Sequence, residues 1–163
     1  MFPLLPTDCK MPNQRRQARA ARRGAALVET AVVLSVFLLL ILGTLDLGVA
    51  TYKYNTLSQA ARQGVRQAVV HGALAAPAMT VWGPSSYEGT AADGSEQAQA
   101  VTSMLAGFKL SDVTIRVEWI DGGNKVQQRV RYSVSSEYRP IIPSFFSQAS
   151  YTLSAASTMP ITH

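Results

Sequence analysis

Hydrophobic positions divide the chain into an apolar N-terminal run, an amphipathic continuation and a C-terminal part with strand-like alternation. The run from Ala25 to Leu45 spans 21 residues, and Glu29 is its one charged residue. A helix of this length rises about 31 Å, close to the roughly 30 Å hydrocarbon core of a bilayer. We therefore expect a transmembrane helix over residues 25–46, with Asp46 at its outer end.

The helical pattern continues beyond the apolar run. Apolar residues such as Leu57, Ala61 and Val65 recur at intervals of three and four, while polar side chains occupy most of the other positions. Gly72 is a natural stop for such a helix. The pattern predicts one long helix that is first transmembrane and then amphipathic over residues 47–72.

The C-terminal part predicts a loop followed by a small domain. Residues 73–94 are rich in glycine, proline and small polar residues, which is typical of a surface loop. Within the small exported domain, residues 95–163, Ser95 can cap a short helix over residues 96–106 that ends before Gly107. This helix is expected to pack on a sheet.

Alternating apolar and polar residues predict an antiparallel β-hairpin over residues 113–134. Its turn is centred on Gly122 and Gly123, since paired glycines allow the tight turns of hairpins. This turn would fix three facing pairs in the register: Trp119 with Val126, Ile115 with Val130, and Val113 with Tyr132. A third antiparallel strand is indicated by the alternation of Tyr151, Leu153 and Ala155. The predicted fold class is α+β, with a long N-terminal helix, a short helix and a small antiparallel sheet.

Positive charge is concentrated at the N-terminus. Residues 1–24 carry a net charge of +5, equal to that of the whole chain. A basic tail can bind nucleic acid, but Lys and Arg beside an apolar run typically stay on the cytoplasmic side of a membrane. We therefore expect a cytoplasmic leader, a single pass through a bacterial inner membrane, and a periplasmic or extracellular C-terminal domain. No nucleic-acid partner is expected.

The sequence offers little material for catalysis or metal binding. Cys9 is the single cysteine, which excludes an intramolecular disulfide, and His71 and His163 are the histidines. Common nucleotide-binding, zinc and nucleophile motifs are absent from the sequence. We expect no catalytic, cofactor-binding or metal-binding residue, no small-molecule substrate and no enzymatic activity. Asp121 and Asn124 could be read as calcium ligands, but their place in the hairpin turn favours a turn role.

Glu29 requires an explanation, because a carboxylate at the centre of a transmembrane helix costs about 2.5 to 3.5 kcal/mol, and less near an end. It could reach the interface or be protonated. Alternatively, cleavage between Gly24 and Ala25 would make it the fifth residue of the mature chain, and it could pair with the new amine of a neighbouring copy. Cleavage near Gly48, as in an ordinary secretory signal, is disfavoured because the apolar run is too long and Asp46 precedes that site.

The segment from Arg22 to Arg66 resembles a known family. An arginine-glycine pair ending at Gly24, an acid five residues later and a long apolar helix resemble the class III leader of type IV pilins and pseudopilins. With Asp46 at the outer end, an aromatic continuation and an Ala/Arg-rich stretch over residues 60–66, the segment is similar to the TadE-like pseudopilins of the tight-adherence (Tad) system.

This resemblance implies a pilin-like structural or assembly component of a tight-adherence (Flp) pilus or secretion machine. Gly24 and Ala25 would form the site processed by prepilin peptidase, and Glu29 would act in subunit assembly. The implied partners are prepilin peptidase, other pilin or pseudopilin subunits, the Tad assembly platform and the inner membrane, with no cofactor. Such a chain could enter an extracellular pilus after assembly, and a start at Met1 or Met11 preserves the leader.

A second hypothesis is a single-span membrane-anchored envelope binding protein with an uncleaved signal anchor. In that case the loop over residues 73–94 or a face of the sheet would bind a partner. Phe145 and Phe146 are compatible with a core position or with an exposed contact. The two hypotheses differ in whether the leader is removed.

Overall fold

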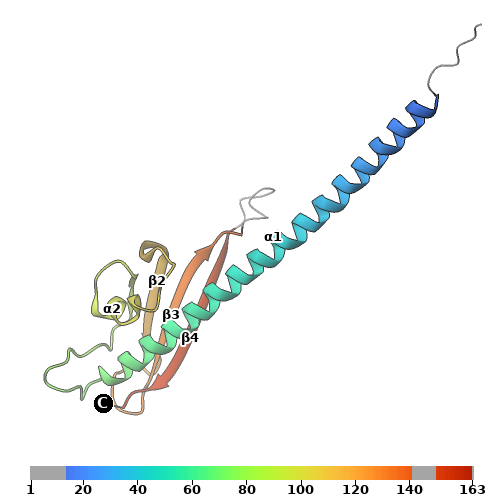
Figure 1. Cartoon of the computed structure of the whole chain (residues 1–163). Coiled ribbons are helices and arrows are strands. Elements are labelled where there is room, and N and C mark those ends of the chain that lie inside the picture. Colours follow the sequence, from blue (N-terminus) through green and yellow to red (C-terminus); the bar gives the residue numbers. More distant parts are fainter. Residues whose placement is uncertain (1–13, 141–149, 163) are drawn as a thin grey trace, which may run out of the picture. The chain divides into compact units, whose positions relative to one another are not determined.

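The computed structural model describes residues 14–140 and 150–162, with side chains described at residue 24 and from residue 26 onward within these ranges. Phe145 and Phe146 lie outside the described residues. The chain divides into two compact units, Met1–Leu42 and Gly43–His163. Its elements, most of them labelled in Figure 1, are α1 (Gln14–Val70), β1 (Tyr87–Thr90), α2 (Glu96–Thr102), the 3₁₀ helix η1 (Leu110–Asp112), β2 (Val113–Trp119), β3 (Arg129–Tyr138) and β4 (Tyr151–Pro160). These elements confirm the predicted α+β class.

The first unit contains the N-terminal part of α1. Every side chain described between residues 26 and 42 is exposed, and an 18-residue window of the helix has a mean hydropathy of 2.5. The hydroxyl groups of Thr30 and Ser35 donate to the backbone carbonyls of Ala26 and Ala31, each at 2.8 Å. The helix is long and apolar enough to cross a membrane, and these hydroxyl groups need no water there.

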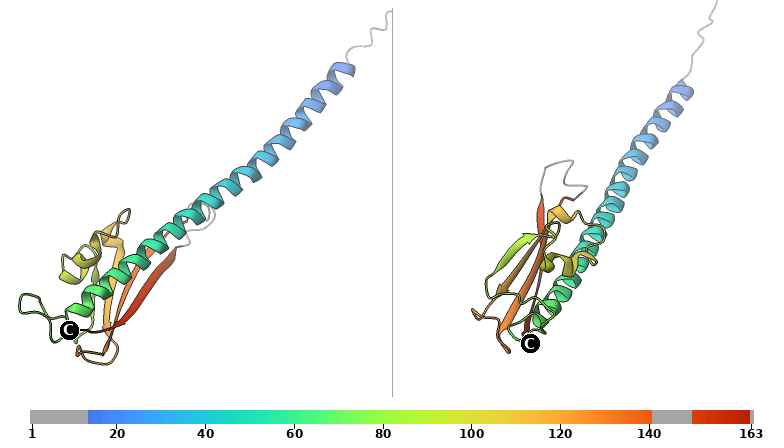
Figure 2. Two further views of the ribbon diagram at one scale, coloured as in Figure 1. Left: turned by 60° about the horizontal axis from the view of Figure 1, so that its bottom comes forward. Right: turned by 90° about the vertical axis from the view of Figure 1, so that its left-hand side faces the viewer.

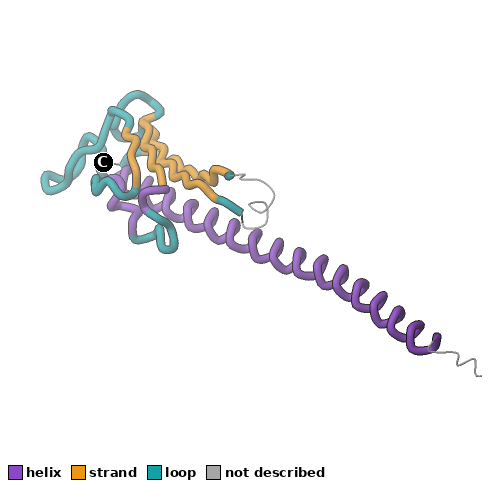
Figure 3. Tube along the Cα trace, turned by 90° about the horizontal axis from the view of Figure 1, so that it is seen from above, coloured by secondary structure: helices purple, strands orange, loops and turns teal. Residues whose placement is uncertain are grey.

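In the second unit, the rest of α1 and the short α2 pack on one face of the sheet (Figure 2). The four strands are antiparallel and follow the order β1-β2-β3-β4. Figure 3 shows the strands in orange beside the helix in purple. Leu57, Ala61 and Val65 are buried, as the amphipathic pattern predicted. They meet buried strand residues that alternate with more exposed ones: Val113, Ile115, Val117, Trp119, Val130, Tyr132 and Val134.

The predicted hairpin register is wrong by four residues. Trp119 faces Val130 instead of Val126, and the other two predicted pairs are replaced by Ile115 with Val134 and Val113 with Ser136. The connection is longer than a two-residue turn, because Gln127 and Gln128 bond to the backbone of Ile161 beyond β4. Ile161 is buried, whereas Val126 is 42% exposed. Because four is even, the shift keeps the apolar residues on the same face of the sheet.

Two further boundaries differ from the prediction. The segment over residues 73–94 is more than a surface loop, because it contains β1 and the buried Trp82. β1 has four residues, too few for alternation to reveal it, and it becomes a strand by pairing with β2. Helix α2 is capped by Ser95, which accepts from the backbone N–H of Ala98, but it ends at Thr102, earlier than predicted.

Asp121 and Asn124 form hydrogen bonds with neighbouring parts of the chain. The carboxylate of Asp121 accepts from the backbone N–H of Arg129 at 2.8 Å and forms an ion pair with its guanidinium. The guanidinium holds the pKa of Asp121 below its usual range. The side-chain amide of Asn124 donates to the carbonyl of Trp82 at 3.1 Å. These contacts favour the turn role over calcium binding.

Tyr132 joins three elements of the core. It is fully buried on β3, and a Cβ added to Gly64 of α1 would overlap its ring. Its hydroxyl donates to the carbonyl of Gln97 on α2 at 2.5 Å. Burial raises the pKa of Tyr132 well above its usual range. Gly64 therefore allows α1 to lie directly against the sheet.

Tyr138 fastens the end of β3 to α1 at Asp46. Its hydroxyl donates to the Asp46 carboxylate and, at 3.0 Å, to the Asp46 backbone carbonyl, and both side chains are buried. Burial, followed by the hydrogen bond to Asp46, raises the pKa of Tyr138 to about 12. Further along α1, the ammonium group of Lys53 lies 5.3 Å from the ring centroids of both Tyr138 and Phe108. Asp46, the predicted outer end of the membrane helix, thus lies against the end of β3.

Gly64→Ala is expected to lower the free energy of unfolding by about 1 to 3 kcal/mol, because the added methyl group overlaps Tyr132. The control is Gly48→Ala in the same helix, where an added Cβ meets no atom within 4 Å. That control should be neutral or stabilising by up to about 1 kcal/mol. Urea unfolding of the full chain in detergent micelles, followed by tryptophan fluorescence, measures both, and equal stabilities would contradict the packing role of Gly64.

Tyr138→Phe is expected to cost about 1.5 to 3 kcal/mol, because a buried hydrogen bond to a carboxylate is lost. The matched control is Tyr151→Phe, since Tyr151 faces Tyr138 in the sheet but is 54% exposed. The same unfolding measurement should show little change for the control. A loss that is no larger for Tyr138→Phe than for Tyr151→Phe would argue against the link to Asp46.

Candidate processing and assembly segment

Gly24 lies within α1, is exposed, and has no described atom within 4 Å of the position that a Cβ would take. Ala25 follows it in the same helix. A glycine inside a helix destabilises it by roughly 0.5 to 1 kcal/mol relative to alanine. At Gly64 the close packing against Tyr132 offsets this cost. No contact in the described chain requires glycine at position 24.

Glu29 lies five residues after Gly24 in α1, a rise of about 7.5 Å. Its side chain is exposed, and no described residue forms a hydrogen bond or an ion pair with it. The nearby hydroxyl groups of Thr30 and Ser35 are satisfied by the helix backbone. The described chain therefore places the predicted processing and assembly residues on one helix and leaves the carboxylate available to a group from outside.

Asp46 differs from Glu29 in this respect. It is 8% exposed, and Tyr138 donates a hydrogen bond to its carboxylate. The two acids that flank the apolar run thus have different environments, one satisfied within the domain and one open. Sequence reasoning found Asp46 as a boundary but missed its partner, because Tyr138 lies 92 residues away in the chain.

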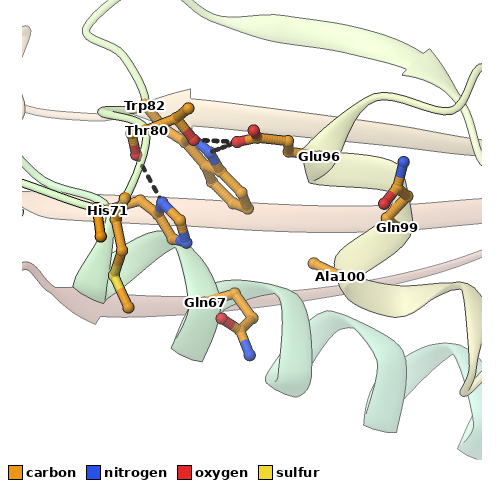
Figure 4. A pocket seen from close by; sticks show the side chains of 9 residues that line it. Gln67, His71, Thr80, Trp82, Glu96, Gln99 and Ala100 are labelled. Carbon is orange, nitrogen blue, oxygen red and sulfur yellow. Dashed lines mark hydrogen bonds between the residues drawn. The ribbon is translucent and has the colours of Figure 1, made fainter.

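A surface pocket of about 310 Å³ lies where α1 ends (Figure 4). His71 and Trp82 form one wall, with their rings stacked 4.3 Å apart and 13° from parallel. Nδ1 of His71 lies 2.6 Å from the carbonyl oxygen of Thr80. Because a carbonyl oxygen only accepts, Nδ1 carries a proton in this arrangement. The rest of the lining comes from α1, the following loop and α2: Gln67, Ala78, Met79, Glu96, Gln99 and Ala100.

Glu96 supplies the charge of this pocket. Its Oε2 accepts from the hydroxyl of Thr80 and, at 3.1 Å, from Nε1 of Trp82 (Figure 4). These two bonds, that of Thr80 first, hold the pKa of Glu96 below its usual range. The pocket combines an ionised carboxylate with an aromatic wall. No group of three or more potential metal-binding side chains occurs in the described ranges.

Sequence reasoning missed this pocket. Its side chains come from three stretches of the chain, and no motif joins them. The one available signal was Trp82, a large aromatic residue in a stretch that otherwise reads as loop. A side chain of that size in a flexible loop favours a packing role, but the sequence does not identify His71 or Glu96 as its neighbours.

Comparison with known protein families gives a match over part of the chain. Residues 24–66 match the family model described as TadE-like protein. No curated protein and no solved structure is significantly similar to the chain. The matched segment begins at Gly24, includes Glu29 and Asp46, and ends at Arg66.

The TadE-like family is one of structural pilus components and not an enzyme family. The matched segment is also the segment whose leader glycine, acid and apolar helix carried the resemblance in the sequence. The match confirms that resemblance: over residues 24–66 the chain is similar to the TadE-like family, which is consistent with a TadE-like pseudopilin of the Tad system and with a component associated with its pilus.

Proposed function

We propose that this chain is a pilin-like structural component of the Tad pilus or of its assembly machine, processed after Gly24 by prepilin peptidase and assembled through Glu29. The observation that carries the proposal is the TadE-like match, which starts at the proposed cleavage site. The exposed apolar helix, with one open carboxylate between residues 26 and 42, supports it.

Cleavage would account for the glycine. Gly24 weakens the helix locally, and no contact in the described chain compensates for it. A small residue before the scissile bond lets a peptidase approach the backbone and open the helix. Hydrolysis of the bond to Ala25 leaves a carboxylate on Gly24 and a protonated amine on Ala25.

Pairing would account for the acid. At an effective dielectric constant of about 20, an amine and a carboxylate 4 Å apart attract by about 4 kcal/mol. This is of the same size as the roughly 2.5 to 3.5 kcal/mol cost of one carboxylate at the centre of a membrane helix. Glu29 of one copy and the Ala25 amine of another would therefore favour association of the apolar helices.

The proposal also fixes a location and partners. The basic leader lies in the cytoplasm, α1 crosses the inner membrane over residues 25–46, and the chain after Asp46 lies outside. The partners are prepilin peptidase, other pilin or pseudopilin subunits and the Tad assembly platform. The role is structural, without catalysis or a small-molecule substrate.

Intact mass of the protein purified from its own membranes tests the processing step. The expected mature chain begins at Ala25, and Gly24→Val is expected to retain the leader, because a branched side chain hinders access to the scissile bond. Gly48→Val is the matched control, since it lies in the same helix and its added Cβ also meets no atom within 4 Å. The control should be processed like the unaltered chain.

An unaltered chain that keeps its arginine-rich leader, in cells that process their other pilins, would exclude this step. The anchored envelope binding protein would then be the better description. Normal processing of Gly24→Val would exclude Gly24 as the recognised residue.

Glu29→Gln is expected to leave membrane insertion unchanged and to reduce recovery in the pilus or assembled fraction by about tenfold or more, the equivalent of about 1.4 kcal/mol per contact. Thr30→Val is the control, because the Thr30 hydroxyl is satisfied by Ala26 of its own helix. Immunoblots of membrane and sheared-surface fractions measure both. Equal recovery of the two variants would remove Glu29 from the assembly step.

A further inference from the structure

Two oppositely charged surfaces lie between α1 and α2 in the second unit. The acidic one is the pocket at Glu96, bounded on α1 by Gln67 and His71. The basic one, which we call the arginine patch, surrounds a hollow of about 260 Å³ lined by Gln59, Arg62, Gln63, Arg66 and Met104. α2 contributes its first residue to the pocket, and the chain just beyond its end contributes Met104 to the patch.

Neither surface forms an ion pair within the described residues. Glu96 accepts hydrogen bonds from two neutral groups, Thr80 and Trp82, and forms no ion pair there. Arg62 and Arg66 are exposed on successive turns of α1, and the described ion pairs involve other arginines. Like charges four residues apart destabilise a helix, so an acidic partner would stabilise this stretch.

The pocket suits a guanidinium group. A planar cation can stack on an aromatic wall and form paired hydrogen bonds to a carboxylate. The stacked rings of His71 and Trp82 provide the wall, and Glu96 provides the carboxylate. The alanine methyl groups and the thioether of Met79 can contact the aliphatic stem of the side chain. A volume of 310 Å³ is at the lower end of ligand pockets, roughly 300 to 1,000 Å³, and fits one long side chain better than a cofactor.

We propose that Arg66 of one copy, with Arg62 beside it, occupies the Glu96 pocket of a second copy. The charges of the two surfaces are complementary, and both surfaces are present on every copy. A membrane anchor gives the copies a common orientation, and in this respect the inference rests on the proposed function. His71 lies five positions after Arg66 in the chain, which corresponds to a helical rise of about 7.5 Å. A second copy shifted by about that distance along α1 therefore brings its Arg66 level with the pocket.

Such a contact uses different surfaces on its two sides. A head-to-tail contact of this kind repeats from copy to copy and does not close after two. It therefore connects exported domains along a row of staggered copies, in addition to any contact between the apolar helices.

Cysteine cross-linking tests the contact while leaving the charged residues in place. In a Cys9→Ser background, a tagged copy carries Gln99→Cys in the pocket, and an untagged copy carries Gln63→Cys in the arginine patch. The two full chains are co-expressed in cells that assemble the protein, oxidised mildly, and separated by size. In the control, the untagged copy carries Arg131→Cys in place of Gln63→Cys. The mixed dimer is expected at about five times or more the yield of this control, because charge-assisted hydrogen bonds would hold the pocket and the arginine patch together. Arg131 is exposed on β3 and alternates with residues of the core face.

Charge reversal decides whether Arg66 and Glu96 make the contact. Glu96→Arg in the tagged copy, or Arg66→Glu in the untagged copy, is expected to lower the yield about fivefold or more. Combining the two reversals restores it to at least about half, because the pair is re-formed with opposite polarity. A yield that is insensitive to either reversal, that is not restored by the combination, or that equals the Arg131→Cys control overturns the inference.

The intact mass of the same samples separates this inference from the proposed function. A charge-dependent mixed dimer between chains that keep their leader supports the pocket contact and contradicts processing. A mature chain that begins at Ala25 but gives no charge-dependent dimer supports processing and contradicts the pocket contact.

Discussion

Helix α1 has to satisfy two environments along one continuous backbone. Over residues 26–42 it exposes apolar side chains on every side, and such a surface is stable only in lipid or against other apolar helices. Over its outer part it buries one side, with Leu57, Ala61 and Val65 against the sheet. The fold of the second unit follows from this second requirement, because the sheet and α2 cover the apolar side that water would otherwise meet.

Two tyrosines of β3 hold α1 in this position, and each does so by a different interaction. Tyr132 fills the space that Gly64 leaves open, which is shape complementarity, and its hydroxyl reaches α2. Tyr138 donates a hydrogen bond to Asp46, which satisfies a buried carboxylate close to the predicted membrane boundary. One contact lies at Gly64, near the end of α1, and the other lies at Asp46, so the sheet is fastened to the helix at two separate points.

The charges that the described chain does not neutralise are informative about neighbours. Glu29 has no described partner in an apolar segment, and Glu96, Arg62 and Arg66 form no ion pair within the described residues. A structural component that repeats in an assembly can satisfy such groups between copies. The two proposed contacts involve different residues of the chain, Glu29 in one case and Arg66 with Glu96 in the other, so they are separable by mutation.

The sequence by itself determined the features that depend on local pattern and composition: the apolar helix and its amphipathic continuation, the Ser95 cap, and the face of β2 and β3 that is buried. Periodicity and capping act over a few residues, so they can be read without a fold.

Only the tertiary structure decided the strand register, the burial of Trp82, the partner of Asp46 and the Glu96 pocket. Each of these joins residues far apart in the chain. Ile161, and not Val126, is buried in the core, and His71, Trp82 and Glu96 meet because α1, the loop and α2 pack against the same sheet. Such contacts depend on which segments compete for the same space, and that competition has no local signature.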